Sequence, residues 1–318
     1  MCIRDRGKGI GATWALETQV SSLEANASAG GVRVDNTGAL QIGGVVGTLS
    51  GVDATGDIAL SSTAGITVIE AITTGGTYEV RLSAFNGVTQ SGADGDITSG
   101  TGGVLINADS NDDGTGGFLS DDIGALITSS GDVTITAADT DLTGSVNAGG
   151  IVSFNSTNNI NVTLGNIDLS TFDLTDVELD LVTAASLIKI DSGSGAIELR
   201  GDIGPDHVGS LQLVTETTID SNALANTITV ATLDLDAGTG IGDTFALGIA
   251  ATTISGDTSA GDIDIDNAAT AGTVDASLAT TGGGTINFDQ DGNQSLKVTT
   301  ASTGAGTVSY THLTLPTM

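Results

Sequence analysis

The sequence is short of basic residues, and this shortage narrows the partners that it can bind. Lys and Arg together number 8 against 39 Asp and Glu, which gives a formal net charge of −31. Binding to nucleic acids rests largely on cationic contacts to phosphates, and anionic membrane surfaces repel acidic chains. We therefore expect no nucleic-acid partner and no direct membrane insertion.

Aromatic residues, proline and cysteine are scarce as well. Aromatics make up 3% of the chain, and there are 2 prolines and 1 cysteine, Cys2. A compact globule of this length normally anchors its core with more aromatic side chains, whereas a solenoid fills each turn with a small aliphatic interior. A single cysteine excludes an internal disulfide, which suits a cytosolic protein and an exported protein without disulfides equally well.

The residues that are abundant favour strands joined by frequent turns. The chain has 47 glycines and is 39% hydrophobic, mostly Val, Ile, Leu and Ala, with much Thr. Such a hydrophobic content is too high for a disordered chain. β-Branched residues favour strands and glycine favours tight corners.

A short motif, Gly-x-Ile/Val/Leu-x-Ile/Leu/Phe, recurs along the chain. Copies begin at Gly38, Gly56, Gly131, Gly150, Gly165, Gly195, Gly261 and Gly284. The glycines at 38, 56, 76 and 95 follow one another at nearly even intervals, although the spacing drifts elsewhere. A second echo relates Val32-Arg33-Val34-Asp35-Asn36 to Ile263-Asp264-Ile265-Asp266-Asn267.

This repetition predicts an all-β fold. Alternation within each copy places aliphatic residues on one strand face and polar residues on the other. A repeat of about 19–20 residues with such alternation is typical of a right-handed parallel β-helix, with two or three short strands in each turn. An array of β-sandwich repeats is the alternative, since short, evenly spaced strands suit it too. The stretch from 12 to 27 has the composition of an amphipathic helix, but we expect a strand followed by a corner there.

Both ends of the chain match one DNA element. The opening MCIRDR can be encoded by ATGTGTATAAGAGACAG, and the reverse complement of that string encodes Val308-Ser309-Tyr310-Thr311-His312. The element resembles the transposase-end adapter that is used to prepare sequencing libraries. We therefore expect residues 1–6 and 308–318 to be adapter-derived, with residues 7–307 forming a β-helix repeat fragment without native ends.

The repeats also resemble a known family of proteins. The runs Gly31–Gly43 and Gly261–Asn267 are similar to filamentous-haemagglutinin-type and related giant β-strand-repeat exoproteins of bacteria. The resemblance extends over most of residues 12–306. It lies in the general pattern of the repeats and in their period, and not in a diagnostic motif. It implies a structural or adhesive stalk segment of a large exported protein, located outside the cell or on the bacterial surface. The partners would be neighbouring repeats of the same longer chain and an unknown surface or glycan ligand.

One acidic loop has the pattern of a calcium site. In Asp109-Ser110-Asn111-Asp112-Asp113-Gly114, oxygen ligands occupy positions 1, 3 and 5 of an EF-hand-like loop and glycine occupies position 6. Asp109, Asn111 and Asp113 are therefore candidate calcium ligands, and calcium is the only candidate cofactor. Position 12 is Ser120 in place of the usual Glu, so the closing ligand would have to be Asp121 or Asp122. A solvated acidic loop is the alternative interpretation.

Three runs place acidic residues at every second position, as on one face of a strand. They are Asp176/Glu178/Asp180, Asp234/Asp236 and Asp262/Asp264/Asp266. Stacked turns would align such carboxylates into ladders, which repel unless counterions bind or solvent screens them. A calcium-dependent surface or glycan-binding module is accordingly an alternative function.

The sequence shows no catalytic motif, and we expect no enzyme and no catalytic residues. It contains neither a GxSxG elbow nor a P-loop, and His207 follows Pro205-Asp206 in an expected exposed loop, with no cysteine near it. Parallel β-helices also include polysaccharide lyases and hydrolases, which is a second alternative. That alternative has few basic candidates, which are Arg33, Arg81, Lys189, Arg200 and Lys297.

Overall fold

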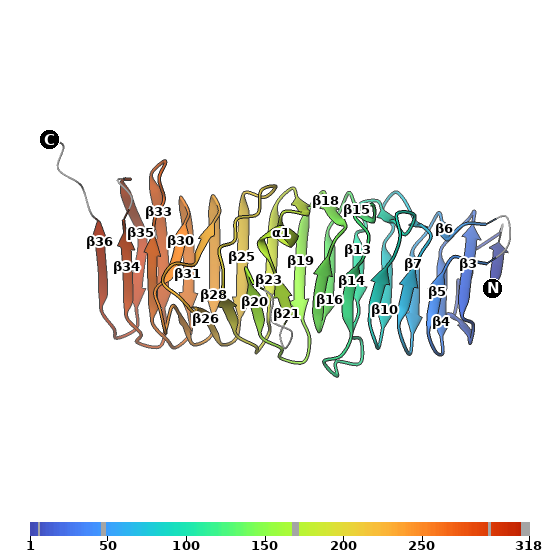
Figure 1. Ribbon diagram of the computed structural model, residues 1–318, viewed down its shortest axis with the longest axis horizontal. Helices are drawn as coiled ribbons and strands as arrows, with labels where there is room; N and C mark the ends of the chain where they lie inside the picture. The colour runs from blue at the N-terminus through green and yellow to red at the C-terminus, as the bar shows by residue number, and fades with distance from the viewer. Residues whose placement is uncertain (6, 46–48, 167–171, 292–293, 313–318) are drawn as a thin grey trace. The chain divides into compact units, whose positions relative to one another are not determined.

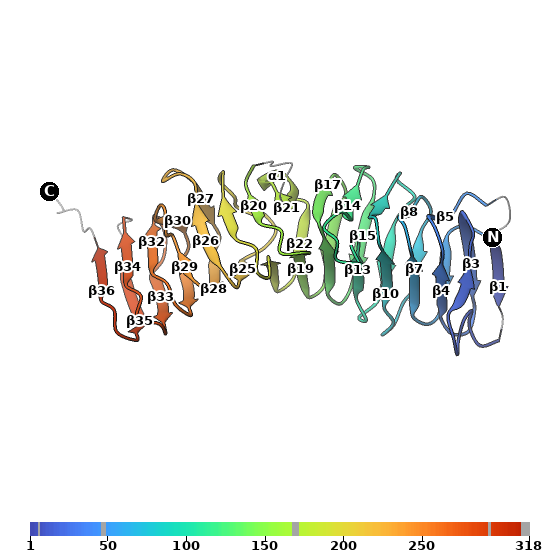
Figure 2. The same cartoon turned by 90° about the horizontal axis from the view of Figure 1, so that it is seen from below.

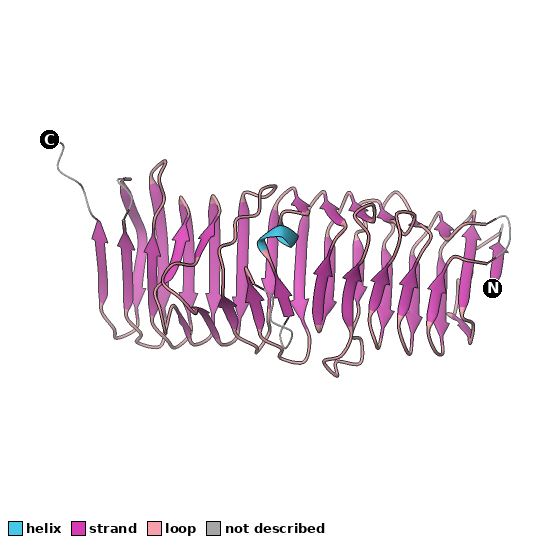
Figure 3. Ribbon diagram, viewed as in Figure 1, coloured by secondary structure: helices cyan, strands magenta, loops and turns pink. Residues whose placement is uncertain are grey.

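The computed structural model describes residues 1–5, 7–45, 49–166, 172–291 and 294–312, and it is nearly all β (Figure 1, Figure 3). Its parallel strands stack as a β-solenoid of about 14 turns. The predicted parallel β-helix is thereby confirmed. The β-sandwich alternative is wrong, because a sandwich is built from antiparallel strands.

The chain forms two compact units. The first comprises residues 1–158 and 181–186, and the second comprises residues 159–180 and 187–318. Among the described helices, none is long and apolar enough to span a membrane.

Each turn of the first unit contributes one strand to each of three faces. Strand β3 bends between two of them, because Ser22 and Leu23 pair with β5 whereas Ala25 to Ala27 pair with β6. The sheet that β3 joins runs in the order β17-β14-β11-β8-β5-β3-β6-β9-β12-β15-β18-β22, with β1 beside β3. Its strands are β1 (Cys2–Asp5), β3 (Ser22–Ala27), β5 (Leu40–Ile42), β6 (Val52–Ala54), β8 (Ile66–Val68), β9 (Ile72–Thr73), β11 (Val88–Gln90), β12 (Ile97–Ser99), β14 (Gly117–Ser120), β15 (Leu126–Ser129), β17 (Asp139–Leu142), β18 (Ser145–Ala148) and β22 (Val182–Ala184). The third face consists of β2 (Leu16–Thr18), β4 (Val32–Asn36), β7 (Ile58–Ser62), β10 (Val80–Ala84), β13 (Val104–Asn107), β16 (Val133–Ala137) and β19 (Ile151–Ser156).

The described part of the second unit has two sheets of parallel strands and one helix (Figure 2). One run consists of β23 (Leu187–Asp191), β25 (Ser210–Thr215), β28 (Thr232–Ala237), β31 (Thr253–Thr258), β33 (Val274–Thr280) and β35 (Leu296–Thr303). The other consists of β20 (Val162–Leu164), β21 (Phe172–Leu174), β24 (Ile197–Leu199), β26 (Thr218–Ser221), β27 (Thr227–Thr229), β29 (Gly240–Ile241), β30 (Leu247–Ala250), β32 (Ile263–Asn267), β34 (Ile286–Gln290) and β36 (Val308–His312). Helix α1 (Asp176–Leu179) follows β21.

The core consists of apolar, mostly aliphatic columns that run from turn to turn. On the third face of the first unit, burial alternates along each strand, so that side chains at every second position point inward. Parallel register places each inward residue on its counterpart in the next turn, at about 4.8 Å. The two columns are Val32, Ile58, Val80, Val104, Val133 and Val152, and Val34, Leu60, Leu82, Ile106, Ile135 and Phe154. All of them are buried.

Several turns are longer than the repeat that the sequence predicted. Val32 pairs with Ile58, and Ile58 pairs with Val80, so each of these turns takes up more of the chain than the expected repeat allows. The pairing of Val133 with Val152 does match the expected length. The glycine spacing misled because Gly38 precedes β5, Gly56 precedes β7 and Gly95 precedes β12, which belong to three different faces.

Close packing of the backbone explains most motif glycines. Gly38 and Gly165 have the positive φ that was expected of corner glycines, but Gly261 does not. A Cβ on Gly261 would lie 1.2 Å from the carbonyl oxygen of Thr239 in the preceding turn. Gly284 would similarly meet the oxygen of Gly261 at 2.1 Å. Apart from Gly38 and Gly150, the motif glycines therefore mark corners where the backbones of successive turns approach too closely for any side chain.

The two terminal segments join the stacked strands. β1 pairs with β3, and β36 pairs with β34 from Val308 to His312. The adapter origin of residues 1–6 and 308–318 stays a prediction, and residues 6 and 313–318 lie outside the described part of the chain. The stretch from 12 to 27 contains β2 and β3, as the strand interpretation predicted.

Candidate functional site

The predicted calcium loop lies between β13 and β14, and Asp109 holds it together. Asp109 is buried, and its Oδ1 accepts a hydrogen bond from the backbone N–H of Asp113 at 3.2 Å. Its Oδ2 accepts from the N–H of Gly114 at 2.9 Å and from the hydroxyl of Thr157 at 2.6 Å. Both carboxylate oxygens thus stabilise the loop itself.

The other two candidate ligands bind each other. Asn111 Nδ2 donates to Asp113 Oδ2 at 2.6 Å, and the Thr115 N–H donates to Asp113 Oδ1 at 3.0 Å. The hydrogen bond from the Thr115 hydroxyl lowers the pKa of Asp113.

The two suggested closing ligands are also engaged locally. Asp121 accepts from the Ser91 hydroxyl, and Asp122 accepts from the Gly124 N–H. Within the described ranges, no group of three or more His, Cys, Asp or Glu residues is placed to hold a metal ion. Calcium binding by Asp109, Asn111 and Asp113 stays a prediction.

One of the three acidic runs is not a strand. Residues 176–179 form helix α1, whose N-cap is Thr175. The Thr175 hydroxyl accepts from the Glu178 N–H at 3.3 Å, and Glu178 Oε2 accepts from the Thr175 N–H at 2.8 Å. This reciprocal capping box turns an alternating pattern into a helical turn. The Thr-x-x-Glu spacing was the signal that the strand interpretation overlooked.

The other two runs lie on strand faces, as expected, and each meets a carboxylate in the next turn. Asp236 of β28 is in register with Asp257 of β31, and Asp266 of β32 is in register with Asp289 of β34. The pKa of Asp266 is raised by burial and by its neighbours Asp291 and Asp289. Elsewhere the ladders are interrupted by neutral partners, such as Ser255 beside Asp234.

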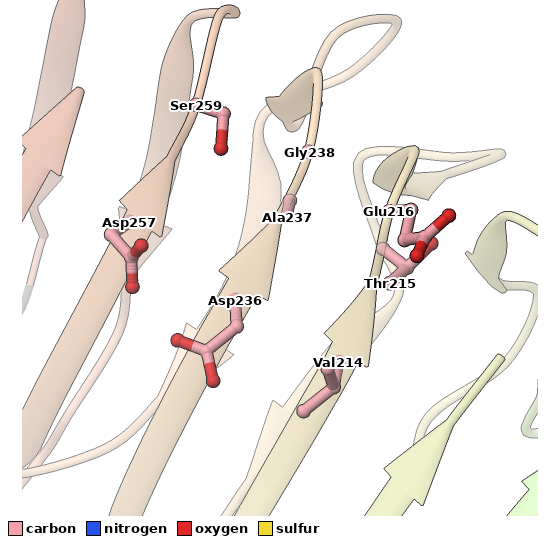
Figure 4. Close-up of a pocket in the computed structure, with 8 residues that line it drawn as sticks. All are labelled: Val214, Thr215, Glu216, Asp236, Ala237, Gly238, Asp257 and Ser259. Atoms are coloured by element: carbon pink, nitrogen blue, oxygen red, sulfur yellow. The ribbon is translucent and has the colours of Figure 1, made fainter. Parts of the chain in front are cut away.

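Asp236 and Asp257 border a hollow of about 380 Å³ at the ends of β25, β28 and β31 (Figure 4). The hollow is lined by Val214, Thr215, Glu216, Asp236, Ala237, Gly238, Asp257 and Ser259. Burial raises the pKa of Asp236 to about 6, and the hydrogen bond with Asp257 and its negative charge add to the shift. The carboxyl of Asp236 therefore keeps its proton to a higher pH than an ordinary aspartate does.

The side-chain amide of Gln212 binds Asp236. Gln212 Nε2 donates to Asp236 Oδ2 and to Asp234 Oδ2, both at 2.9 Å. Lys189, one strand further along, pairs with Asp191 at 2.9 Å. Gln212 thus bridges two carboxylates of one strand, and the carboxyl of Asp236 can take up a proton at mildly acidic pH.

We expect Asp236→Asn to flatten the pH dependence of stability. The pKa of Asp236 in the folded protein lies above the ordinary 3.8, so the neutral side chain favours the folded state. This contribution to the free energy of unfolding is complete below about pH 4 and is lost as the pH rises through about 6. Asp236 is half-buried, and after solvent screening we expect a gain of ~1 kcal/mol at pH 7 for the variant. The free energy of unfolding measured from pH 4 to pH 8 checks this.

Asp206→Asn, in an exposed loop, makes the same change of charge and should leave the slope unchanged. A wild-type pH profile that persists in Asp236→Asn would contradict the assignment.

Among the other candidate residues, His207 is exposed, as expected. Lys189, Arg200 and Lys297 lie in the second unit and pair with Asp191, Glu198 and Asp275. The structure brings together two basic residues that are distant in the sequence, Arg33 and Arg81, on the third face of the first unit.

The comparisons with known proteins add no relative. No protein-family model matches the chain, and no match is found among curated proteins or among solved structures.

Proposed function

We propose that this chain is a structural or adhesive stalk segment of a large exported bacterial surface protein, and that it has no catalytic role. The proposal rests on the two apolar columns of the third face, which run through successive strands from β4 to β19. Each turn there performs the same structural task, which is to bury its inward residues against the turns on either side.

Other features support a scaffold. Outward positions alternate with the buried ones along β4, β7, β10 and β16, so these strands run without interruption. The acidic surface favours solubility. The resemblance of the repeats to filamentous-haemagglutinin-type exoproteins supports a location outside the cell, with neighbouring repeats of a longer chain as structural partners.

Sequencing the source DNA across this locus tests the proposal most directly. We expect further repeats of the same kind and a signal for export upstream. A short gene in which the repeats adjoin a catalytic module would contradict the stalk.

A second test concerns catalysis. Incubation with neutral and acidic polysaccharides should release no reducing ends and no unsaturated products above a buffer control. A rate that saturates with substrate and falls in Asp257→Asn would make the protein an enzyme after all.

A further inference from the structure

The third face of the first unit carries a second hollow, which is lined by two arginines, Arg33 and Arg81, and by two acidic residues, Asp57 and Glu79. It has a volume of about 480 Å³ and lies over β4, β7 and β10. Arg33, Ala59 and Arg81 are in register on these strands, so the small Ala59 side chain leaves space between the two arginines. Their Cα atoms are two strands apart, about 10 Å.

The two arginines of this hollow differ in their ion pairs. Arg81 pairs with Glu79, with its Nη2 at 2.7 Å and its Nε at 2.9 Å from Glu79 Oε1. The other carboxylate, that of Asp57, accepts a hydrogen bond from the Glu79 N–H at 3.1 Å. Arg33 is exposed and, among the described residues, forms no ion pair. A guanidinium that forms no ion pair with any described residue is unexpected in a chain of net charge −31.

A smaller hollow of about 180 Å³ adjoins the first, since Arg33 and Asp57 line both. Lys8 contributes a third basic residue, and Gly11 and Ala12 form part of its wall. Trp14 follows Gly11 and Ala12 in the chain and is 84% exposed, and it belongs to the lining of neither hollow. It is the chain's only tryptophan.

We propose that these joined hollows, the basic groove lined by Lys8, Arg33 and Arg81, bind an oligosaccharide that carries carboxylate groups. A guanidinium forms paired hydrogen bonds with a carboxylate, and Arg33 can do so without leaving an ion pair of the described residues. Arg81 already pairs with Glu79 through Nε and Nη2, so it would contribute only its remaining N–H groups to a second acidic group of the ligand. The exposed indole of Trp14 offers a flat apolar face on which a sugar ring can stack. Asp57 and Glu79 also line the groove, and Glu79 is already paired with Arg81. The acidic residues outside the groove repel such a ligand weakly, because salt screens charges beyond about 8 Å.

This inference goes beyond the stalk proposal and stands independently of it. If the groove binds no oligosaccharide, the proposal of a structural stalk still holds. If the protein binds and cleaves the oligosaccharide, the stalk proposal is contradicted and the binding site is not.

The experiment is a fluorescence titration of the whole chain, in which Trp14 is the only tryptophan reporter. Trigalacturonate should change the Trp14 emission and saturate, whereas neutral maltotriose should have no effect. Arg33→Gln should weaken trigalacturonate binding tenfold or more, and Arg33→Lys should restore part of it. Raising the salt concentration should weaken binding as well.

Lys297→Gln removes an exposed basic residue of the second unit, which pairs with Asp275 at 3.0 Å, and should leave the affinity unchanged. Circular dichroism confirms that each variant is folded, and calorimetry on Arg81→Gln provides a second measurement should Arg33→Gln not fold. The proposal is overturned if trigalacturonate does not bind, if maltotriose binds equally well, or if both arginine variants retain wild-type affinity. An equal response to hexa-aspartate would also overturn it, in favour of an acidic peptide.

Discussion

Gly261→Ala is expected to destabilise the second unit by about 3 kcal/mol or more, the largest effect of a single methyl group that we predict. The added Cβ would lie 1.2 Å from the Thr239 carbonyl oxygen, and that oxygen belongs to the backbone of the preceding turn. Neither atom can move alone, because the turns are joined through paired strands on both sides of the corner, as at Ile241 and Ile263. Chemical denaturation measures the loss.

Gly209→Ala is the matched control in the same unit. No atom lies within 4 Å of a Cβ at Gly209, and its φ is not positive. Alanine there restricts the unfolded chain and should stabilise the protein by about 0.4–1 kcal/mol. Two identical substitutions should thus have opposite signs. Equal effects at Gly209 and Gly261 would show that glycine acts here through chain flexibility and not through close packing.

These glycines show what the sequence could and could not predict. Alternation in copies such as the one at Gly56 predicted parallel strands with one aliphatic face, because every turn repeats the same burial. The length of a turn was not predictable from glycine spacing, since glycines at corners of different faces look alike in the sequence. Only the register, such as Ile58 on Val80, distinguishes them.

The candidate sites were less predictable than the fold. Asp236 was recognised within its strand, but its partner Asp257 was not, because their contact depends on the register between two successive turns. Arg33 and Arg81 were recognised only as scattered basic residues, since two turns separate them. Local patterns report one strand at a time, whereas each of these sites is formed by side chains of successive turns.

The second large effect on stability is predicted at the asparagine that ends two similar segments, Val32–Asn36 and Ile263–Asn267. Both copies end in a buried asparagine at a corner. Asn267 Oδ1 accepts from the Ala251 N–H at 3.0 Å, and its Nδ2 donates to the Ala251 carbonyl at 3.1 Å and to Gln290 Oε1 at 2.7 Å. The repeat of this residue thus reflects a hydrogen-bonded corner, which the sequence pattern did not reveal.

Asn267→Ala is expected to lower the free energy of unfolding by about 2–4 kcal/mol, because it leaves the backbone N–H and C=O of Ala251 and the oxygen of Gln290 buried without partners. Asn287→Ala removes an exposed amide that donates to Asp264 at 2.8 Å, and it should change stability by less than about 0.5 kcal/mol. Asn267→Asp provides a sharper comparison. Its carboxylate would face two oxygens, so we expect a variant that is unstable at pH 7 and recovers as the pH falls and the acid becomes neutral. Equal stability of Asn267→Asp at pH 4 and pH 7 would mean that this corner is open to water and that the hydrogen bonds of Asn267 do not hold it.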